Sequence, residues 1–123
     1  MKTILPFLLL LFTVEALAQQ ACFPETDYDC GPVRRDTVLV HRFRFLNEGT
    51  EALEVLSAIS TCPCVRAEVP LRTVPPGGEG EVLVTFRGEG RRLGDFRQLV
   101  RVYTNAAEKP VNLHLKGTLL SGR

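Results

Sequence analysis

The sequence predicts an all-β protein, an immunoglobulin-like antiparallel β-sandwich of about seven strands. Two observations predict this fold. Apolar and polar side chains alternate with a period of two in several segments, and turn residues separate those segments. The longer apolar period that marks an amphipathic helix is missing from the sequence after its first eighteen residues. A partly open barrel built from the same strands is the alternative architecture.

The segment 37–46 is the clearest predicted strand, and a short strand near 28–33 precedes it. Along 37–46 the side chains alternate between an apolar or aromatic inner face and a charged outer face. The inner residues are Leu39, His41, Phe43 and Phe45, and the outer arginines are Arg42 and Arg44. A turn at 47–50 ends the strand, where Gly49 can adopt a positive φ.

The next two predicted strands lie on either side of a cysteine-containing bend. The segment 52–59 places Leu53 and Val55 on its inner face, and a short strand at 65–69 follows the bend. The stretch 73–80 reads TVPPGGEG. It predicts a loop, because its prolines lack backbone donors and its glycines have no side chains to pack.

The last three predicted strands are 81–86, 96–104 and 111–120. A glycine- and arginine-rich connection at 87–94 separates the first two, and a hairpin loop at 105–109 separates the last two. Their predicted inner residues are Val82, Val84, Phe86, Phe96, Val100, Val102, Val111, Leu113 and Leu115.

The N-terminus has the pattern of a secretory signal peptide, which we assign to residues 1–18. A basic start precedes an apolar run, and small residues stand where cleavage would follow Ala18. We therefore expect a secreted or periplasmic protein with an N-terminal tail at 19–27 and one sandwich domain at 28–120. Lipidation at Cys22 is disfavoured because the preceding residues lack the expected aliphatic side chain. With no second apolar run, we expect no transmembrane segment.

Composition and motifs exclude several classes of function. A formal net charge of +1 gives no reason to expect a nucleic-acid partner. No nucleophile, base and carboxylate form a recognisable catalytic set, and Ser57 and Ser60 have no motif around them. The histidines are predicted to face apart: His41 lies on the inner face as a core or rim residue, and His114 points outward. We therefore expect neither an enzyme nor a bound cofactor.

The bend Cys62-Pro63-Cys64 is the most unusual short segment. Pro63 fixes its own φ and favours an extended Cys62, so the two sulfurs should project to the same side. Export would make oxidation available to them. A disulfide between residues two apart is possible although the span is tight. Two thiolates also suit Cu(I), whereas structural zinc would need about four ligands that the sequence does not supply.

Four cysteines allow three pairings, and the sequence cannot choose among them. We favour a bridge between Cys22 and Cys30, which would attach the N-terminal tail to the first strand. Cys62 and Cys64 would then be paired locally or remain reduced.

Eight short segments in a fixed order resemble a known family. They are CGPV at 30–33, HRFRFLNEG at 41–49, LEV at 53–55, CPC at 62–64, VPPGGEGEVLVTF at 74–86, GDF at 94–96, VRVYTN at 100–105 and LHLKG at 113–117. Together they resemble the bacterial domain of unknown function 1573, over nearly the whole chain from residue 28 onward. The resemblance implies an exported protein of a family common in Bacteroidetes-type bacteria. It also implies a fold similar to the immunoglobulin-like modules of abnormal-spindle, hydin and major sperm proteins.

The resemblance further implies a binding or assembly module rather than an enzyme. This chain departs from the family pattern at two positions. Pro63 stands where members usually have glycine between two cysteines, and Cys30 stands where they tend to have phenylalanine. Because of these two departures, the cysteines of this chain need not have the role that they have in other members of the family.

Two functional hypotheses follow. The first is an exported interaction or scaffold module that binds another envelope or secreted protein, or a glycan. Its candidate contacts are Arg91 and Arg92 in the 87–94 connection and the apolar residues of the outer faces, Val38, Val40, Leu46, Leu99 and Tyr103. Coverage of these apolar residues by the N-terminal tail is the alternative to docking. The second, alternative hypothesis is a small periplasmic thiol-redox or Cu(I)-binding protein that uses Cys62 and Cys64.

Overall fold

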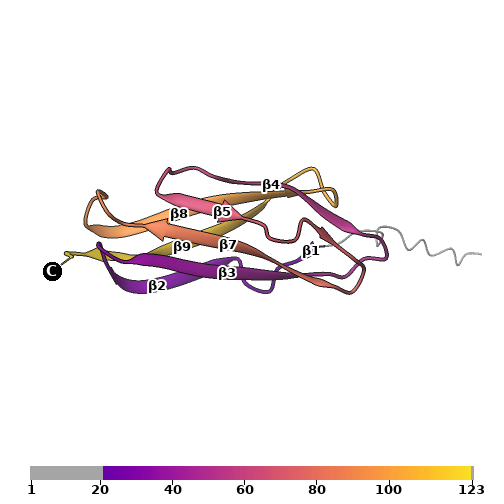
Figure 1. The fold of residues 1–123 in the computed structure, drawn as a ribbon, viewed down its shortest axis with the longest axis horizontal. Coiled ribbons are helices and arrows are strands. Elements are labelled where there is room, and N and C mark those ends of the chain that lie inside the picture. The colour runs from indigo at the N-terminus through magenta and orange to yellow at the C-terminus, as the bar shows by residue number, and fades with distance from the viewer. Residues whose placement is uncertain (1–20, 123) are drawn as a thin grey trace, which may run out of the picture.

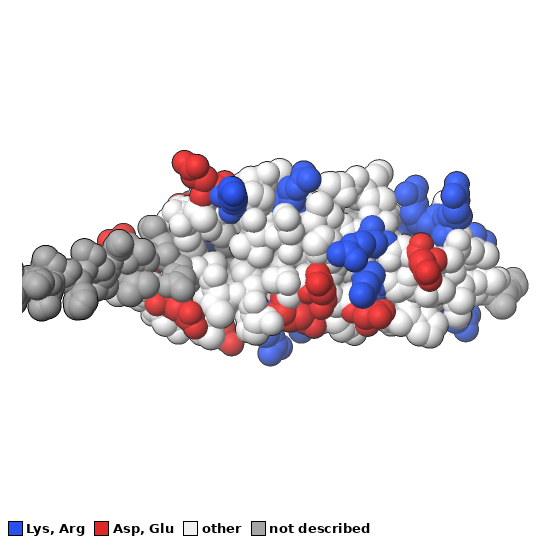
Figure 2. Space-filling model, turned by 180° about the vertical axis from the view of Figure 1, so that it is seen from behind, with Lys and Arg blue, Asp and Glu red and all other residues white. Residues whose placement is uncertain are grey.

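The computed structural model describes residues 21–122, and these residues form β-strands and no helix (Figure 1). The body is elongated along the strand direction, as it also is when seen from behind (Figure 2). The strands are β1 (Ala21–Cys22), β2 (Asp27–Arg34), β3 (Val38–Asn47), β4 (Leu53–Ser60), β5 (Val65–Glu68), β6 (Thr73–Val74), β7 (Glu79–Arg87), β8 (Gly94–Thr104) and β9 (Val111–Leu120). No helix long and apolar enough to cross a membrane occurs within residues 21–122.

The strands form two sheets, which confirms the sandwich. The four-stranded sheet has the order β1-β3-β7-β5, and the five-stranded sheet has the order β2-β9-β8-β4-β6. Seven of the strands match the predicted ones, and the two additional strands, β1 and β6, have two residues each.

Strand β2 runs parallel to β9, whereas the sequence analysis expected every pair to be antiparallel. The chain pairs with β3 at Ala21–Cys22 and then crosses to the other sheet through residues 23–26. It therefore reaches the edge of β9 without the hairpin that would make the pairing antiparallel. The remaining strand pairs are antiparallel, as predicted.

The predicted tail at 19–27 is part of the sandwich where the structure describes it. Ala21 and Cys22 pair with Asn47 and Leu46, and the ring of Phe23 stacks on Phe45 with 4.9 Å between centroids. The domain therefore begins before residue 28. The predicted signal peptide and its cleavage site lie outside the described residues.

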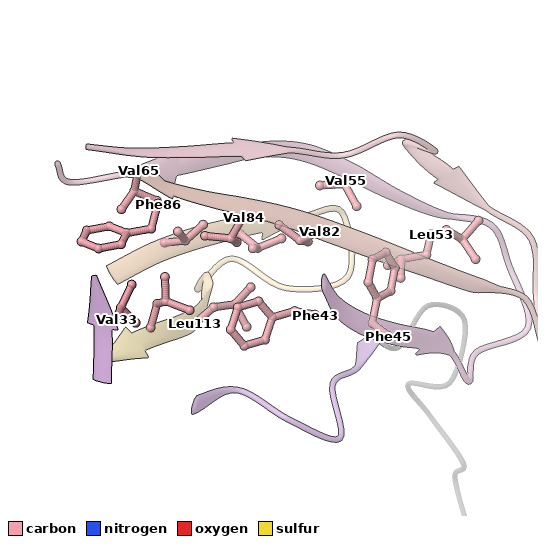
Figure 3. Packing of buried hydrophobic residues seen from close by; sticks show 14 of the residues in the cluster. Val33, Phe43, Phe45, Leu53, Val55, Val65, Val82, Val84, Phe86 and Leu113 are labelled. Carbon is pink, nitrogen blue, oxygen red and sulfur yellow. The ribbon is translucent and has the colours of Figure 1, made fainter. Parts of the chain in front are cut away.

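Alternation of side chains builds the core between the sheets. Inner residues of β3 and β7, which are neighbours in the four-stranded sheet, pack against those of β9 in the other sheet, as Phe43, Val84 and Leu113 do (Figure 3). The fully buried aromatic rings are those of Phe43, Phe45 and Phe86. Each buried side chain of this size contributes about 1.5 to 3 kcal/mol by leaving water. Four predicted inner residues pack at the rim and are only partly buried: Leu39, His41, Phe96 and Val111.

The predicted loop at 73–80 is shorter than expected. Thr73 and Val74 pair with β4 as β6, and β7 already begins at Glu79. The two prolines and two glycines at 75–78 interrupt pairing, because proline lacks the backbone donor that a sheet requires. The residues on either side of these four, in β6 and at the start of β7, still pair within the sheets.

Strand β4 contains an irregularity that changes which residues face outward. The register with β8 shifts between Val55 and Ser57. Val55 is buried before the shift, and Ala58 packs against the core after it. Ile59 therefore points outward and is 51% exposed.

Candidate functional site

The bend at Cys62-Pro63-Cys64 joins β4 to β5 across the two sheets. It lies at the same end of the sandwich as the β7–β8 loop and the C-terminus (Figure 1). The amide of Val65 donates to the carbonyl of Cys62 (3.0 Å), and the amide of Arg87 donates to the carbonyl of Cys64 (2.9 Å). The hydroxyl of Ser60 lies 2.8 Å from the carbonyl oxygen of Val65 and 3.1 Å from that of Cys62. These bonds fix the backbone of the bend.

Cys62 and Cys64 are joined by a disulfide, with 5.2 Å between their Cα atoms. Both sulfurs therefore lie on the same side of the bend, as predicted. The sulfur of Cys62 accepts a hydrogen bond from the backbone amide of Cys64 (3.2 Å). It also accepts one from the guanidinium of Arg91 (3.4 Å). The structure thus brings three predicted site residues together: Cys62, Cys64 and Arg91.

A surface hollow of about 320 Å³ lies beside the disulfide, and its lining includes Cys64 but not Cys62. The other lining residues are Pro63, Arg87, Glu89 and Arg91. The loop that carries Arg91 is closed by a hydrogen bond from its amide to the carbonyl of Gly88 (2.9 Å). Gly90 adopts φ +80° in this loop, a conformation that other residues rarely adopt.

In the disulfide form the bend offers no thiolate to Cu(I), the metal of the alternative hypothesis. Bound metal requires free thiolates, and the two sulfurs are bonded to each other. The guanidinium of Arg91 lies 3.4 Å from one sulfur and would repel a cation there. Within residues 21–122, no group of three or more His, Cys, Asp or Glu side chains could hold a metal ion.

Cys22 and Cys30 are free thiols, so the favoured bridge between them is not formed in the structure. The two side chains point in different directions: Cys22 lies beside Leu46 on the outer face of the four-stranded sheet, whereas Cys30 packs against the core between the sheets. Burial and the neighbouring charge of Asp29 raise the pKa of the Cys30 thiol to about 11. Cys30 is therefore almost entirely protonated, and unreactive, at neutral pH.

The histidines have separate partners, as expected from their positions on the strands. His41 lies 2.8 Å from a carboxylate oxygen of Glu25 and stacks on Tyr28 with 3.6 Å between ring centroids. His114 lies on the outer side of β9, 2.9 Å from a carboxylate oxygen of Asp27. The prediction that His41 is a core or rim residue of the inner face is confirmed, because its side chain is partly buried at the rim.

The outer apolar residues do not form one surface. Val38 and Val40 lie on the outer face of the four-stranded sheet, whereas Leu99 and Tyr103 lie on the outer face of the five-stranded sheet. Leu46 is partly buried beside β1. These residues are therefore divided between the outer faces of the two sheets.

A smaller surface does form between β4 and β8. Ile59 lies opposite Arg101, and the side chains of Leu99 and Tyr103 flank Arg101 along the same face of β8. We call the group Ile59, Leu99, Arg101 and Tyr103 the β4–β8 patch. Leu99 and Tyr103 were predicted from the sequence; Ile59 was missed because the register shift in β4 reverses its direction.

Other residues that sequence reasoning missed lie near the disulfide. Arg87 and Glu89 line the hollow, and the guanidinium of Arg35 donates to the carbonyl of Arg91 (3.4 Å). Arg87 and Glu89 belong to the 87–94 connection, whereas Arg35 lies between β2 and β3, so the contact of Arg35 with this loop depends on the tertiary fold. Arg92 is exposed on the same loop, and the structure shows no hydrogen bond or ion pair for it within residues 21–122.

Solved structures with the same fold come from proteins of different kinds. A protein of unknown function from Porphyromonas gingivalis W83 matches with a TM-score of 0.70 and 16% identity; the match covers 84% of this chain and 49% of that chain. The PapD-like domain 7 of human CEP192, an ASH / PapD-like domain, matches with a TM-score of 0.65 and 12% identity, over 100% of this chain and 99% of that chain. This likeness confirms the predicted similarity to abnormal-spindle-type modules.

The secreted serine protease VesC from Vibrio cholerae matches with a TM-score of 0.59 and 13% identity, over 85% of this chain and 23% of that chain. This chain thus spans about half of the P. gingivalis protein and about a quarter of the protease. At these identities the comparisons show the fold alone. A comparison with curated proteins found no match.

The comparison with protein families supports the order of motifs noted in the sequence. The sequence profile of the family described as "Protein of unknown function (DUF1573)" matches residues 21–119. The matched range begins with β1 and ends in β9, so it includes every strand of the sandwich. The chain therefore belongs to the DUF1573 family.

Proposed function

We propose that the protein is an exported, non-catalytic immunoglobulin-like module that binds another envelope or secreted protein through the β4–β8 patch. Export rests on the basic start, the apolar run and the small residues at 16–18. The non-catalytic role is supported by the packed sandwich core, whose interior is filled by side chains.

The observation that carries the proposal is the apolar content of an open sheet face. Ile59 is 51% exposed, and Leu99 and Tyr103 lie diagonally across from it on β8. Aromatic and aliphatic side chains grouped around an arginine are typical of the energetically important centre of a protein interface.

Charge on the same face indicates the chemistry of the partner. Arg97, Arg101 and Lys116 form no ion pair within residues 21–122. Two acidic groups of this face have partners within the sheet: Asp95 accepts from the hydroxyl of Thr118 (2.9 Å), and Asp27 contacts His114. A partner surface with apolar side chains flanked by carboxylates would complement it.

Site-specific photo-crosslinking in the native cell envelope tests the proposal. A photoreactive residue placed at position 59 or 99 should capture one protein species. The same residue at position 40, equally exposed on the opposite sheet, should not capture it. Arg101→Glu should weaken capture at both patch positions, because it replaces the central cation with an anion.

Three outcomes would contradict the proposal. One is capture of the same species from position 40. Another is capture that is insensitive to Arg101→Glu. The third is an adduct that survives complete proteolysis, which would identify a glycan rather than a protein.

A further inference from the structure

We propose that the Cys62–Cys64 disulfide is a thiol-exchange site that oxidises a pair of thiols on an acidic partner, once per molecule. In this reaction Cys64 is the sulfur that is attacked, and Cys62 leaves as a thiolate. The inference rests on residues at the end of the sandwich and does not depend on the β4–β8 patch.

The two sulfurs differ in their surroundings, and this difference assigns their roles. Two donors already point at Cys62: the backbone amide of Cys64 at 3.2 Å and the guanidinium of Arg91 at 3.4 Å. A charged donor stabilises a thiolate more than a neutral sulfur. Cys64, in contrast, lines the open hollow where a thiol can approach.

The exchange conserves atoms and electrons in two steps. A partner thiolate attacks the sulfur of Cys64, forming a mixed disulfide, while the Cys62–Cys64 bond breaks and its electron pair stays on Cys62. The second partner thiolate then attacks the partner sulfur of the mixed disulfide and releases Cys64. The partner dithiol loses two electrons and two protons to become a disulfide, and Cys62 and Cys64 gain them as thiols.

The bend does not depend on the disulfide for its shape. Its backbone is held by the amides of Val65 and Arg87, which donate to the carbonyls of Cys62 and Cys64. The hydroxyl of Ser60 adds a further contact to the same backbone. Reduction removes none of these bonds, so the two thiols should remain adjacent and able to re-form the disulfide.

Positive charge around the hollow favours an acidic partner. Arg87 and Arg91 line it, Arg35 contacts the backbone of Arg91, and Arg92 follows in the same loop. Most of the basic groups on the face seen in Figure 2 lie in the half of the molecule farther from the grey N-terminal trace. Glu89 offsets only part of this charge. A cysteine flanked by carboxylates should therefore be attracted.

Thiol kinetics on the full-length protein test the assignment. The two cysteine pairs fall on different tryptic peptides, because cleavage after Arg44 and Arg66 isolates residues 45–66. Mass spectrometry can therefore follow Cys62 and Cys64 without interference from Cys22 and Cys30. The first probe is 2-mercaptoethanol, whose only charge is its thiolate. The second is a pair of dithiol peptides that differ only in having Glu or Lys beside each cysteine.

We expect 2-mercaptoethanol to open the disulfide and to leave its adduct on Cys64. Arg91→Gln should slow this opening by about two- to fivefold, because the leaving thiolate loses an exposed charged donor. Arg92→Gln is the matched control: it removes the same charge from the same loop without touching Cys62, and it should change the rate far less. The Glu-flanked dithiol peptide should be oxidised faster than the Lys-flanked one.

The proposal is overturned if the adduct is found on Cys62, or if Arg91→Gln and Arg92→Gln slow opening equally. Faster oxidation of the Lys-flanked peptide would refute the acidic partner. Circular dichroism and thermal unfolding of each variant, with and without reductant, serve as the folding control. Loss of the fold on reduction would also overturn the proposal, since it would make the disulfide a structural clamp.

Discussion

Asn47 shows how a single buried polar side chain fixes the end of a strand. Its side chain is fully buried, and its amide nitrogen donates to the carbonyls of Glu51 (2.7 Å) and Val74 (3.0 Å). Its side-chain oxygen accepts from the amide of Gly49 (2.9 Å). One residue therefore ties the end of β3 to the following turn and to β6.

Replacing Asn47 with alanine should lower the free energy of unfolding by about 2 to 4 kcal/mol, because three backbone groups lose their partner in a buried place. Urea unfolding measures the change. Asn112→Ala on the exposed side of β9 is the control and should cost less than about 0.5 kcal/mol. Equal losses for the two variants would show that the Asn47 network does not stabilise the fold.

Cys30 should make stability fall at alkaline pH. Its pKa is raised from 9.0 to about 11, with burial as the main cause. The folded state therefore holds this proton more tightly than the unfolded state does. The Cys30 thiol therefore makes its full contribution to the free energy of unfolding below pH 9. This contribution is lost as the pH rises toward 11.

The measurement is the free energy of unfolding at several pH values between 8 and 11 for the wild type and Cys30→Ala. The two proteins share every other titrating group. The difference between the pH dependence of their free energies of unfolding therefore reports Cys30 alone. A steeper decline in the wild type is expected. Parallel curves would contradict the raised pKa.

At the scale of strands, close approach of the sheets depends on small residues at particular positions. Gly80 in β7 lies opposite Phe45 in β3. A Cβ at position 80 would lie 2.5 Å from Phe45 Cζ and 2.9 Å from Val74 Cγ2. Any larger residue must displace a buried ring or the short strand β6.

Gly80→Ala should therefore destabilise the protein by about 1 to 3 kcal/mol, as overpacked cores do. Gly122→Ala is a suitable control, because a Cβ there would make ordinary contact with Asp36 at 3.4 Å. Thermal unfolding of both variants distinguishes them. Equal stability of Gly80→Ala and Gly122→Ala would contradict the close packing of β6 and β7 around Phe45.

Alternation predicted most strands well but could not predict how they pair. Leu53 and Val55 were placed correctly, because a buried apolar side chain every second residue is a direct consequence of the pleat. Ile59 was missed because the shift in β4 belongs to its pairing with β8. Val55 and Leu56 still alternate, buried and then exposed, so the sequence carries no direct signal of the shift that follows them.

The candidate site was only partly predictable for a related reason. The sequence identified Cys62, Cys64 and Arg91 separately, from the rigid bend and from an arginine-rich loop. The contact between Arg91 and the sulfur of Cys62 joins residues 29 positions apart and depends on the ends of β4 and β7 meeting. The Cys22–Cys30 bridge was predicted without knowing the pairing of β1 with β3, which turns Cys22 to the outer face while Cys30 packs against the core.

As a whole molecule, the protein places its two proposed surfaces on a rigid body. The β4–β8 patch lies on the outer face of the five-stranded sheet, and the disulfide with its arginines lies at one end. The core between the sheets is filled by side chains from both, so binding should occur on the exterior.

Hydroxyl-radical footprinting of the protein, alone and with the purified partner, tests the central claim most directly. The account predicts that oxidation of Ile59, Leu99 and Tyr103 falls when the partner binds, while oxidation of Val38 and Val40 on the opposite sheet stays unchanged. Protection of Val38 and Val40 with an unchanged β4–β8 patch would contradict it.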